Sequence, residues 1–363
     1  MARNRIIYQS LALYAGQTNA QTGDHTTSGT VQQLSRVQSW DSDFSRSFTD
    51  INQYGQLAAI DRIEVEAPTV NMSTSWYPTN GFNEKSIGLS VCASGAAPTA
   101  LLSGILKKET DEKNYFLLVA NEGSDAVGFA GAKTGVFGIG NTFLTSYSLE
   151  ASVGDVPKSS ADFEALNFAV YADASLPKSI PAINPTSGTK ITGINFTLPS
   201  ATENTQSPQI TVLRPGDITL ELTNDHVKGF DSSDIKIQSF TLSTELGRSP
   251  IEKLGSRFPF SREIDFPITA SLSVDAQMGD LRDFNLSDLL CETGSYNMTI
   301  TLKENSCSGN GAPALVAQLK GAKLVSENVT TSIGDNASVT LEYEVSIGGP
   351  EDLTKGIFLS GSY

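Results

Sequence analysis

The stretch Val339-Thr-Leu-Glu-Tyr-Glu-Val-Ser-Ile347 alternates apolar and polar residues over nine positions. A period of two residues is typical of a β-strand with one face buried and the other in water. The same alternation recurs in residues 268–274, 70–76 and 218–222, and residues 6–14 form a further strand candidate. Helical spacing appears only in two short stripes, Leu101, Leu102, Ile105 and Leu106, and Leu286, Leu289 and Leu290. The sequence therefore predicts an all-β fold with minor α content.

The strands belong to two copies of one pattern. Val37-Gln-Ser-Trp40 matches Ile237-Gln-Ser-Phe240, and Ile51-Asn-Gln-Tyr-Gly55 matches Ile251-Glu-Lys-Leu-Gly255, both at an offset of 200 residues. Keeping this offset pairs Met72 with Leu272, although Pro68 and Pro267 suggest 199. We keep 200 because a slip of one residue would move every side chain of the next strand to the other face.

Further along the chain the offset only falls. It is 184 for residues 102–106 against 286–290, 181 for Tyr115 against Tyr296, and 180 for residues 152–155 against 332–335. Ordered matches with a shrinking offset indicate a duplicated domain whose first copy carries an insertion of about sixteen residues. We place this insertion between Trp76 and Leu102, as a long loop or hairpin.

These matches divide the chain into two domains and a connector. The first copy covers residues 1–180, with its insertion near 77–100, and the second covers 216–363. Residues 181–215 are rich in Pro, Ser and Thr, and we expect an ordered connector because apolar residues such as those in 191–198 suit no flexible linker. Residues 17–35 are expected to form a polar loop.

Composition limits the classes of function. The chain has 363 residues, 25 Lys plus Arg and 40 Asp plus Glu, for a net charge of −15. Binding to nucleic acids or to anionic membranes requires a positively charged surface, so both functions are disfavoured. No apolar run suggests a membrane span, and no apolar signal core follows Met1–Arg5. Cys92, Cys291 and Cys307 lack the spacing of a disulfide framework or a zinc site, which fits reduced thiols in a protein made in the cytoplasm.

Candidate chemical motifs each have a plainer explanation. Residues 131–134 lack the glycine that a phosphate-binding loop needs before its lysine. Glu342 and Glu344 share one strand face as a carboxylate pair could, but this is the polar face of an alternating strand. Asp231 and Asp234 lack the remaining ligands of a calcium loop, and the two histidines, His25 and His226, lie among polar residues. We therefore expect no catalytic, cofactor-binding or metal residues, and no enzymatic activity.

The blocks that carry the duplication also carry a resemblance. The first copy contains Arg36-Val-Gln-Ser-Trp40, Phe44-Ser-Arg46, Asp50-Ile-Asn-Gln-Tyr-Gly55 and Leu57-Ala-Ala-Ile-Asp-Arg62; the second contains Leu246-Gly-Arg248, Leu254-Gly-Ser-Arg-Phe-Pro-Phe260, Gly348-Gly-Pro350 and Gly356-Ile-Phe-Leu-Ser-Gly-Ser-Tyr363. As a set they resemble the tail tube proteins of tailed bacteriophages. The resemblance covers most of both halves and rests on loose patterns rather than a strict motif.

The resemblance implies two tandem antiparallel β-sandwich or barrel domains, each with a short flanking helix. In that family the sheets join edge to edge into a ring of six domains, and rings stack into a tube. Two domains per chain then imply a ring of three chains with pseudo-sixfold symmetry. The implied location is the virion tail, after synthesis in the host cytoplasm. The implied partners are further copies of the chain and other tail proteins: a sheath if the tail contracts, a tape measure, a tail terminator and a baseplate.

The resemblance also implies that DNA passes through the lumen without specific binding. An acidic wall suits this role, because basic walls would bind DNA through counterion release. Residues 17–35, 41–62, 77–100 and 241–262 are too long for simple hairpin turns, so we expect some of them to reach the neighbouring ring.

Two alternatives stay open from the residues alone. One is another virion structural protein, such as a capsid decoration or tail completion protein. The other is a two-domain β-sandwich protein that binds or hydrolyses carbohydrate, which would need clustered aromatic residues and carboxyls of raised pKa. The presence of only two tryptophans, Trp40 and Trp76, counts against this last class.

Overall fold

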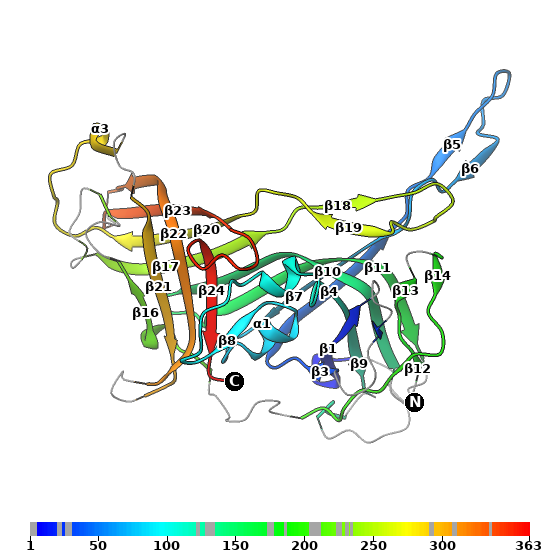
Figure 1. Cartoon of the computed structure of the whole chain (residues 1–363), viewed down its shortest axis with the longest axis horizontal. Coiled ribbons are helices and arrows are strands. Elements are labelled where there is room, and N and C mark those ends of the chain that lie inside the picture. Colours follow the sequence, from blue (N-terminus) through cyan, green and yellow to red (C-terminus); the bar gives the residue numbers. More distant parts are fainter. Residues whose placement is uncertain are drawn as a thin grey trace.

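The structure is a computed structural model that describes residues 6–19, 24–25, 31–120, 124–127, 135–172, 178–184, 187–202, 212–222, 227–228, 232, 235–289, 294–306, 311–333 and 336–363. Strands dominate these residues, which confirms the predicted all-β fold (Figure 1). Most strands belong to one sheet of 16 strands, and among the described residues this sheet stays open rather than closing into a barrel.

The long central part of this sheet contains four strands from each half of the chain, all antiparallel to their neighbours. In spatial order the strands are β4 (Val37–Ser45), β7 (Thr69–Trp76), β11 (Lys158–Tyr171), β10 (Gly135–Ser152), β17 (Lys236–Glu245), β20 (Thr269–Gln277), β23 (Ser338–Ser346) and β22 (Pro313–Thr330). The two halves meet where β10 pairs with β17.

The two longest strands connect the central sheet to a second layer. Both β10 and β22 carry a bulge, after Leu144 and Leu324 respectively, and a bulge bends a strand. The N-terminal part of β10 pairs with β9 (Glu112–Val119) on one side and still with β11 on the other. The N-terminal part of β22 lies between β21 (Tyr296–Lys303) and β24 (Gly356–Gly361). Next to these lie β1 (Leu11–Asn19) and β16 (Ile218–Glu221). The main apolar core draws on both layers.

The duplication predicted from the sequence extends to the register of individual residues. Trp76 lies opposite Ser159 in the first copy, and Ala276 lies opposite Val339 in the second, so the offsets are 200 and 180. Both copies have a bulge at the equivalent place, between residues 37 and 39 of β4 where it pairs with β7, and between residues 237 and 239 of β17 where it pairs with β20. Met72 and Leu272 face Phe163 and Tyr343, so the predicted phase is confirmed.

One pairing from the sequence is wrong by two residues. Backbone register places Tyr115 opposite Ile139 and Met298 opposite Leu319, so Tyr115 corresponds to Met298 rather than to Tyr296. The two tyrosines nevertheless pack on rings at equivalent positions, Phe163 and Tyr343. The ring centroids are 5.0 Å apart for Tyr115 and Phe163 and 6.4 Å apart for Tyr296 and Tyr343. This shared aromatic contact explains the match in sequence.

The insertion is in the predicted place but is not a simple loop or hairpin, since it contains a helix and a strand and most of its residues outside 93–98 are buried. Residues 77–100 contain α1 (Phe82–Ser86) and β8 (Val91–Ala93), and β8 pairs in parallel with β24 from the end of the chain. Ile87 and Leu89 are buried in the main core. The insertion therefore fastens the last strand of the second copy to the first copy. The expectation that some of the long segments reach a neighbouring ring stays a prediction.

A buried carboxyl fixes this insertion to the central sheet. The Glu84 carboxyl, on α1, accepts hydrogen bonds from Trp76 Nε1 at 3.0 Å and from Ser159 Oγ at 3.3 Å. Burial raises the pKa of Glu84, which favours the neutral acid over the carboxylate. We interpret this group as structural, because both of its partners belong to the framework strands β7 and β11.

The remaining elements are short. The helix α2 (Ser103–Leu106) lies in the first copy and α3 (Leu286–Leu289) in the second, so the described residues of the first copy contain two α-helices instead of the one expected. Within the predicted loop 17–35, the described residues include the end of β1, β2 (Asp24–His25) and β3 (Gln32–Gln33), so that stretch is partly strand. The other elements are η1 (Tyr8–Ser10), β5 (Thr49–Ile51), β6 (Asp61–Ile63), β12 (Lys178–Ser179), β13 (Ile183–Asn184), β14 (Thr189–Lys190), β15 (Asn195–Phe196), η2 (Pro215–Asp217), β18 (Arg248–Ile251) and β19 (Ser261–Ile264).

The described part of the proline-rich connector is ordered against the first copy. Ala182, Ile191 and Phe196 of the connector are buried, with the preceding Ile180, in a second apolar cluster that also contains residues of β1, β9 and β10. Phe196 stacks on Phe116 with 4.3 Å between the ring centroids. The domain boundaries 1–180, 181–215 and 216–363 remain a prediction from the sequence.

The burial of the insertion yields a first prediction. Ile87→Ala should lower the free energy of unfolding by about 2–5 kcal/mol, because it leaves a cavity in the core. Ile60→Ala, in an exposed loop, is the matched control and should change it by less than about 0.5 kcal/mol. Urea denaturation followed by circular dichroism measures both, and equal effects would show that the insertion is not part of the core.

Candidate functional site

Inside the chain, the two copies meet along a short antiparallel contact that we call the internal seam. It joins residues 146–152 of β10 to residues 239–245 of β17, with Ser148 opposite Ser243 and Leu149 opposite Leu242. Backbone hydrogen bonds run from Val153 N to Gln238 O at 2.8 Å and, at the other end, from Leu246 N to Thr145 O at 2.7 Å. On the core side, the apolar residues of the seam are buried, among them Leu149, Leu242 and Phe240.

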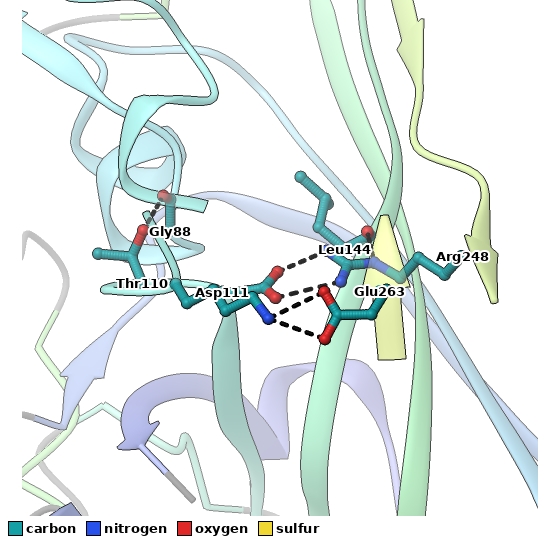
Figure 2. A network of polar contacts seen from close by, with 7 residues as sticks. Gly88, Thr110, Asp111, Leu144, Arg248 and Glu263 are labelled. Carbon is teal, nitrogen blue, oxygen red and sulfur yellow. Dashed lines mark hydrogen bonds and ion pairs between the residues drawn. The ribbon is translucent and has the colours of Figure 1, made fainter. Parts of the chain in front are cut away.

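A hairpin of the second copy reinforces this seam. The second hairpin, β18–β19, continues from β17 and reaches over the first copy (Figure 1). The buried Arg248 guanidinium donates to the Asp111 carboxylate at 2.6 Å and to the Leu144 carbonyl at 2.9 Å, as Figure 2 shows. Arg262, also buried, forms an ion pair with Glu164 on β11. The hairpin therefore places two arginines of the second copy on carboxylates of the first.

A further contact of this hairpin lies nearer the surface. Lys108 Nζ donates to both carboxylate oxygens of Glu263 at 2.8 Å. Hydrogen bonds from Lys108 and Ser261 hold the pKa of Glu263 below its usual value. Because both side chains of the Lys108–Glu263 pair are partly exposed, it contributes little to stability compared with the buried arginine contacts.

Among the described residues, the eight central strands leave two edges outside the seam with a partner on one side only. The first is β4, which pairs with β7, and the second is the C-terminal part of β22, residues 323–330, which pairs with β23. Apolar side chains lie exposed on both: Phe44 is 62% exposed and Val329 46%. Open edges with exposed apolar residues invite pairing with another strand.

The face of the central sheet turned away from the core is polar, and we call it the polar face. One row of directly opposed residues crosses all eight central strands. On the first six strands every residue of the row is a serine: Ser39, Ser75, Ser160, Ser148, Ser243 and Ser271. On β23 and β22 the row continues with Glu344 and Lys323. Neighbouring hydroxyls hydrogen-bond along the row, as between Ser148 and Ser160 at 2.7 Å. A continuous row across β10 and β17 shows that the polar face runs through the seam without interruption.

Carboxylates outnumber lysines on the polar face. Its carboxylates are Asp41, Asp43, Glu150, Asp162, Glu164, Glu245, Asp275, Glu342 and Glu344, and its lysines are Lys158, Lys236 and Lys323. Several of the carboxylates accept a hydrogen bond from a hydroxyl group. Asp162 accepts one from Ser146 and Asp275 one from Thr340, each at 2.7 Å. The result is a hydroxyl-rich surface with a negative field.

The first hairpin, β5–β6, repeats the second in register. Asp50 lies opposite Arg62 as Pro250 lies opposite Arg262, and Ile60 N donates to Ile51 O as Phe260 N donates to Ile251 O. It projects away from the sheet in Figure 1. Its loop carries Tyr54 and Leu57, both fully exposed, as is Leu254 in the second hairpin. Residues 41–62 and 241–262, expected to be long and protruding, are therefore strand-and-hairpin arms with apolar tips.

The candidate chemical residues from the sequence are not brought together. Glu342 and Glu344 are exposed on the polar face, and Cys92 is a buried free thiol. Residues 131–134, Asp231, Asp234, His226, Cys291 and Cys307 lie outside the described residues, as does the side chain of His25. In the described ranges, no cluster of three or more His, Cys, Asp or Glu side chains is placed to hold a metal ion, and no helix is long and apolar enough to cross a membrane.

Sequence reasoning missed the arginine contacts of the second hairpin. Arg62 and Arg262 match in the repeat, which was a usable signal, but Arg248 has Phe48 at its equivalent position. Its partner Asp111 is far away in the sequence, so only the fold shows the pair.

Comparisons with known proteins add little. No protein-family model matches the chain, and no curated protein matches it. Among solved structures, a chain of "Cryo-EM structure of the anti-feeding prophage (AFP) baseplate, 6-fold symmetrised" is similar at 14% sequence identity and a TM-score of 0.23, over 40% of this chain and 91% of that chain. We base no argument on a likeness at this TM-score.

The buried arginine yields a second prediction. Arg248→Ala should lower the free energy of unfolding by about 3–5 kcal/mol, because it leaves the Asp111 carboxylate, only 10% exposed, without its partner. Lys107→Ala removes the exposed pair with Glu351 and should cost at most about 1 kcal/mol. Chemical denaturation at pH 7 compares the two, and similar losses would mean that Arg248 does not anchor the hairpin.

Proposed function

We propose that this protein is the structural subunit of a phage tail tube, in which copies of the chain join edge to edge into rings and the rings stack. The observation that carries the proposal is the continuous central sheet. It already contains one edge-to-edge joint between repeated units, the internal seam, and its outer strands leave two further edges open.

Closure of a ring explains the open edges. A long open edge with exposed apolar residues is an aggregation hazard, and closing a sheet on itself removes it. The edges at β4 and β22 lie at opposite ends of the eight central strands, so joining them is a head-to-tail contact. Head-to-tail contacts give rings when the rotation closes. With six domains in a ring, as the resemblance to tail tube proteins implies, three chains complete it.

The polar face suits the wall of a channel for DNA. Its carboxylates exceed its lysines, and DNA is held mainly by cations that neutralise its phosphates. A wall of hydroxyls and carboxylates repels the duplex and gives it no counterions to release, so it does not slow passage. The opposite face is covered by the apolar core and cannot line a channel.

The rest of the proposal concerns contacts beyond the ring. The arms at β5–β6 and β18–β19 extend from the sheet with exposed apolar tips, and stacking on the next ring would bury these tips. The proposed setting is the virion tail, where the further partners are other tail proteins such as tape measure, terminator and baseplate. In this role the chain is a building unit and carries out no catalysis.

Electron microscopy of the purified protein tests the function and supplies the third prediction. We expect rings or tubes whose averaged views down the axis show three outer repeats around an inner wall that is nearly sixfold, since the insertion at 77–100 makes the copies unequal. Six chains per ring would refute the stoichiometry. Monomers at all protein concentrations, or globular particles without a channel, would refute the tube.

A further inference from the structure

We infer that two copies of this chain join by antiparallel pairing of residues 326–332, at the end of β22 and just after it, with residues 39–45 of β4 of the second copy. In this register Asn328 lies opposite Asp43. The inference rests on the proposed function only in requiring that the chain self-associates. It follows from the internal seam, which the chain repeats on both sides.

The register follows from the two offsets of the repeat. Adding 180 to a residue of β10 gives its equivalent in β22, and subtracting 200 from a residue of β17 gives its equivalent in β4. Ser148 opposite Ser243 thus becomes Asn328 opposite Asp43. The terminal hydrogen bonds of the seam become Ile333 N to Gln38 O and Arg46 N to Val325 O.

The bulges support the same register. The bulge between residues 37 and 39 in β4 repeats the one between 237 and 239 in β17, and the bulge after Leu324 repeats the one after Leu144. A bulge shifts pairing by one residue and fixes the twist of its strand. Two edges with the same bulges as the internal seam therefore present the same shape to each other.

Burial shows what covers the edges. At the internal seam, Leu149 is 0% exposed and Thr244 is 2% exposed. Their equivalents at the open edges are Val329 and Phe44, which are 46% and 62% exposed. The matching segment of a second copy covers both, which favours a second copy over an unrelated partner strand.

Charge also favours a second copy. In the chain, the arm β18–β19 brings Arg262 to Glu164 across the seam. The equivalents are Arg62 on the arm β5–β6 and Glu344 on β23, both exposed here. Arg62 now lies 3.2 Å from the exposed Asp50, a weak pair that it can exchange for Glu344 of the neighbouring chain. The repeat thus supplies the new contact with opposite charges.

Disulfide trapping tests the register and gives the fourth prediction. The hydrogen bonds that flank Ser146 and Ser152 make Ser148 and Ser243 a non-hydrogen-bonded pair, whose Cα atoms lie about 4.5 Å apart, close enough for a disulfide. Asn328→Cys combined with Asp43→Cys should therefore cross-link neighbouring chains on mild oxidation. Non-reducing gels should lose the monomer band to dimer and trimer bands, with no larger ladder if three chains close the ring.

Three controls fix the interpretation. Ser148→Cys with Ser243→Cys places the same pair in the internal seam and should form a disulfide within one chain. Asn328→Cys with Ser42→Cys puts the two thiols on opposite sheet faces and should leave the monomer band. The two single variants measure any cross-link through Cys92, Cys291 or Cys307. Equal cross-linking by the slipped pair would overturn the register.

A charge exchange gives the fifth prediction. Arg62→Glu or Glu344→Arg alone should raise the protein concentration at half assembly about tenfold, because like charges then face each other across the contact. The double variant should restore the original concentration. Glu342→Arg, two residues away on the same strand face, is the matched control. Light scattering measures the assembly of all four variants. If the double variant does not recover the original concentration, Arg62 and Glu344 do not meet across the contact between chains.

The outcomes separate the two proposals. Tubes that form normally while the Asn328–Asp43 pair stays uncross-linked, although the internal control pair oxidises, would overturn the register and leave the tube in place. Cross-linked trimers that never stack into tubes would support the register and overturn the tube. A chain that stays monomeric in every measurement would overturn both.

Discussion

Backbone hydrogen bonds between β10 and β17 join two four-stranded units into one continuous antiparallel sheet. Because the units are repeats, a joint that satisfies the last strand of the first copy leaves the equivalent strand of the second copy unsatisfied. The first strand, β4, is left open for the same reason. A tandem repeat joined in this way ends in two complementary edges, and adding copies moves these edges without removing them until the sheet closes.

Periodicity was enough to predict the framework of this sheet. The alternating stretches at 70–76, 268–274 and 339–347 are β7, β20 and the body of β23. The offsets of 200 and 180 also hold residue by residue, since Met72 and Leu272 take equivalent places. These strands were predictable because each has one face in the core and one in water, and this alternation is written in the sequence itself.

The insertion and the arginine contacts were not predictable in the same way. Residues 77–100 begin with turn-forming residues, but β8 is held by β24 from the other end of the chain, and no local pattern encodes that parallel pairing. Arg248 likewise depends on Asp111, in the other copy. The Tyr115–Tyr296 match misled because side-chain packing was kept while the backbone register moved by two residues. Long-range partners decide such features, and sequence patterns report mostly on neighbours.

The open edges are less apolar than the seam they repeat. Ser42 stands where Leu242 is buried, and Glu327 stands where Tyr147 is buried. Burial already raises the pKa of Glu327, and covering it with a second chain adds to the cost of its charge. In the assembly proposed above, the contact between chains is therefore weaker than the joint within the chain, which favours folding of the monomer before assembly. The proposed tube needs this order of events, because two open edges as apolar as the internal seam would be a stronger aggregation hazard in the free monomer.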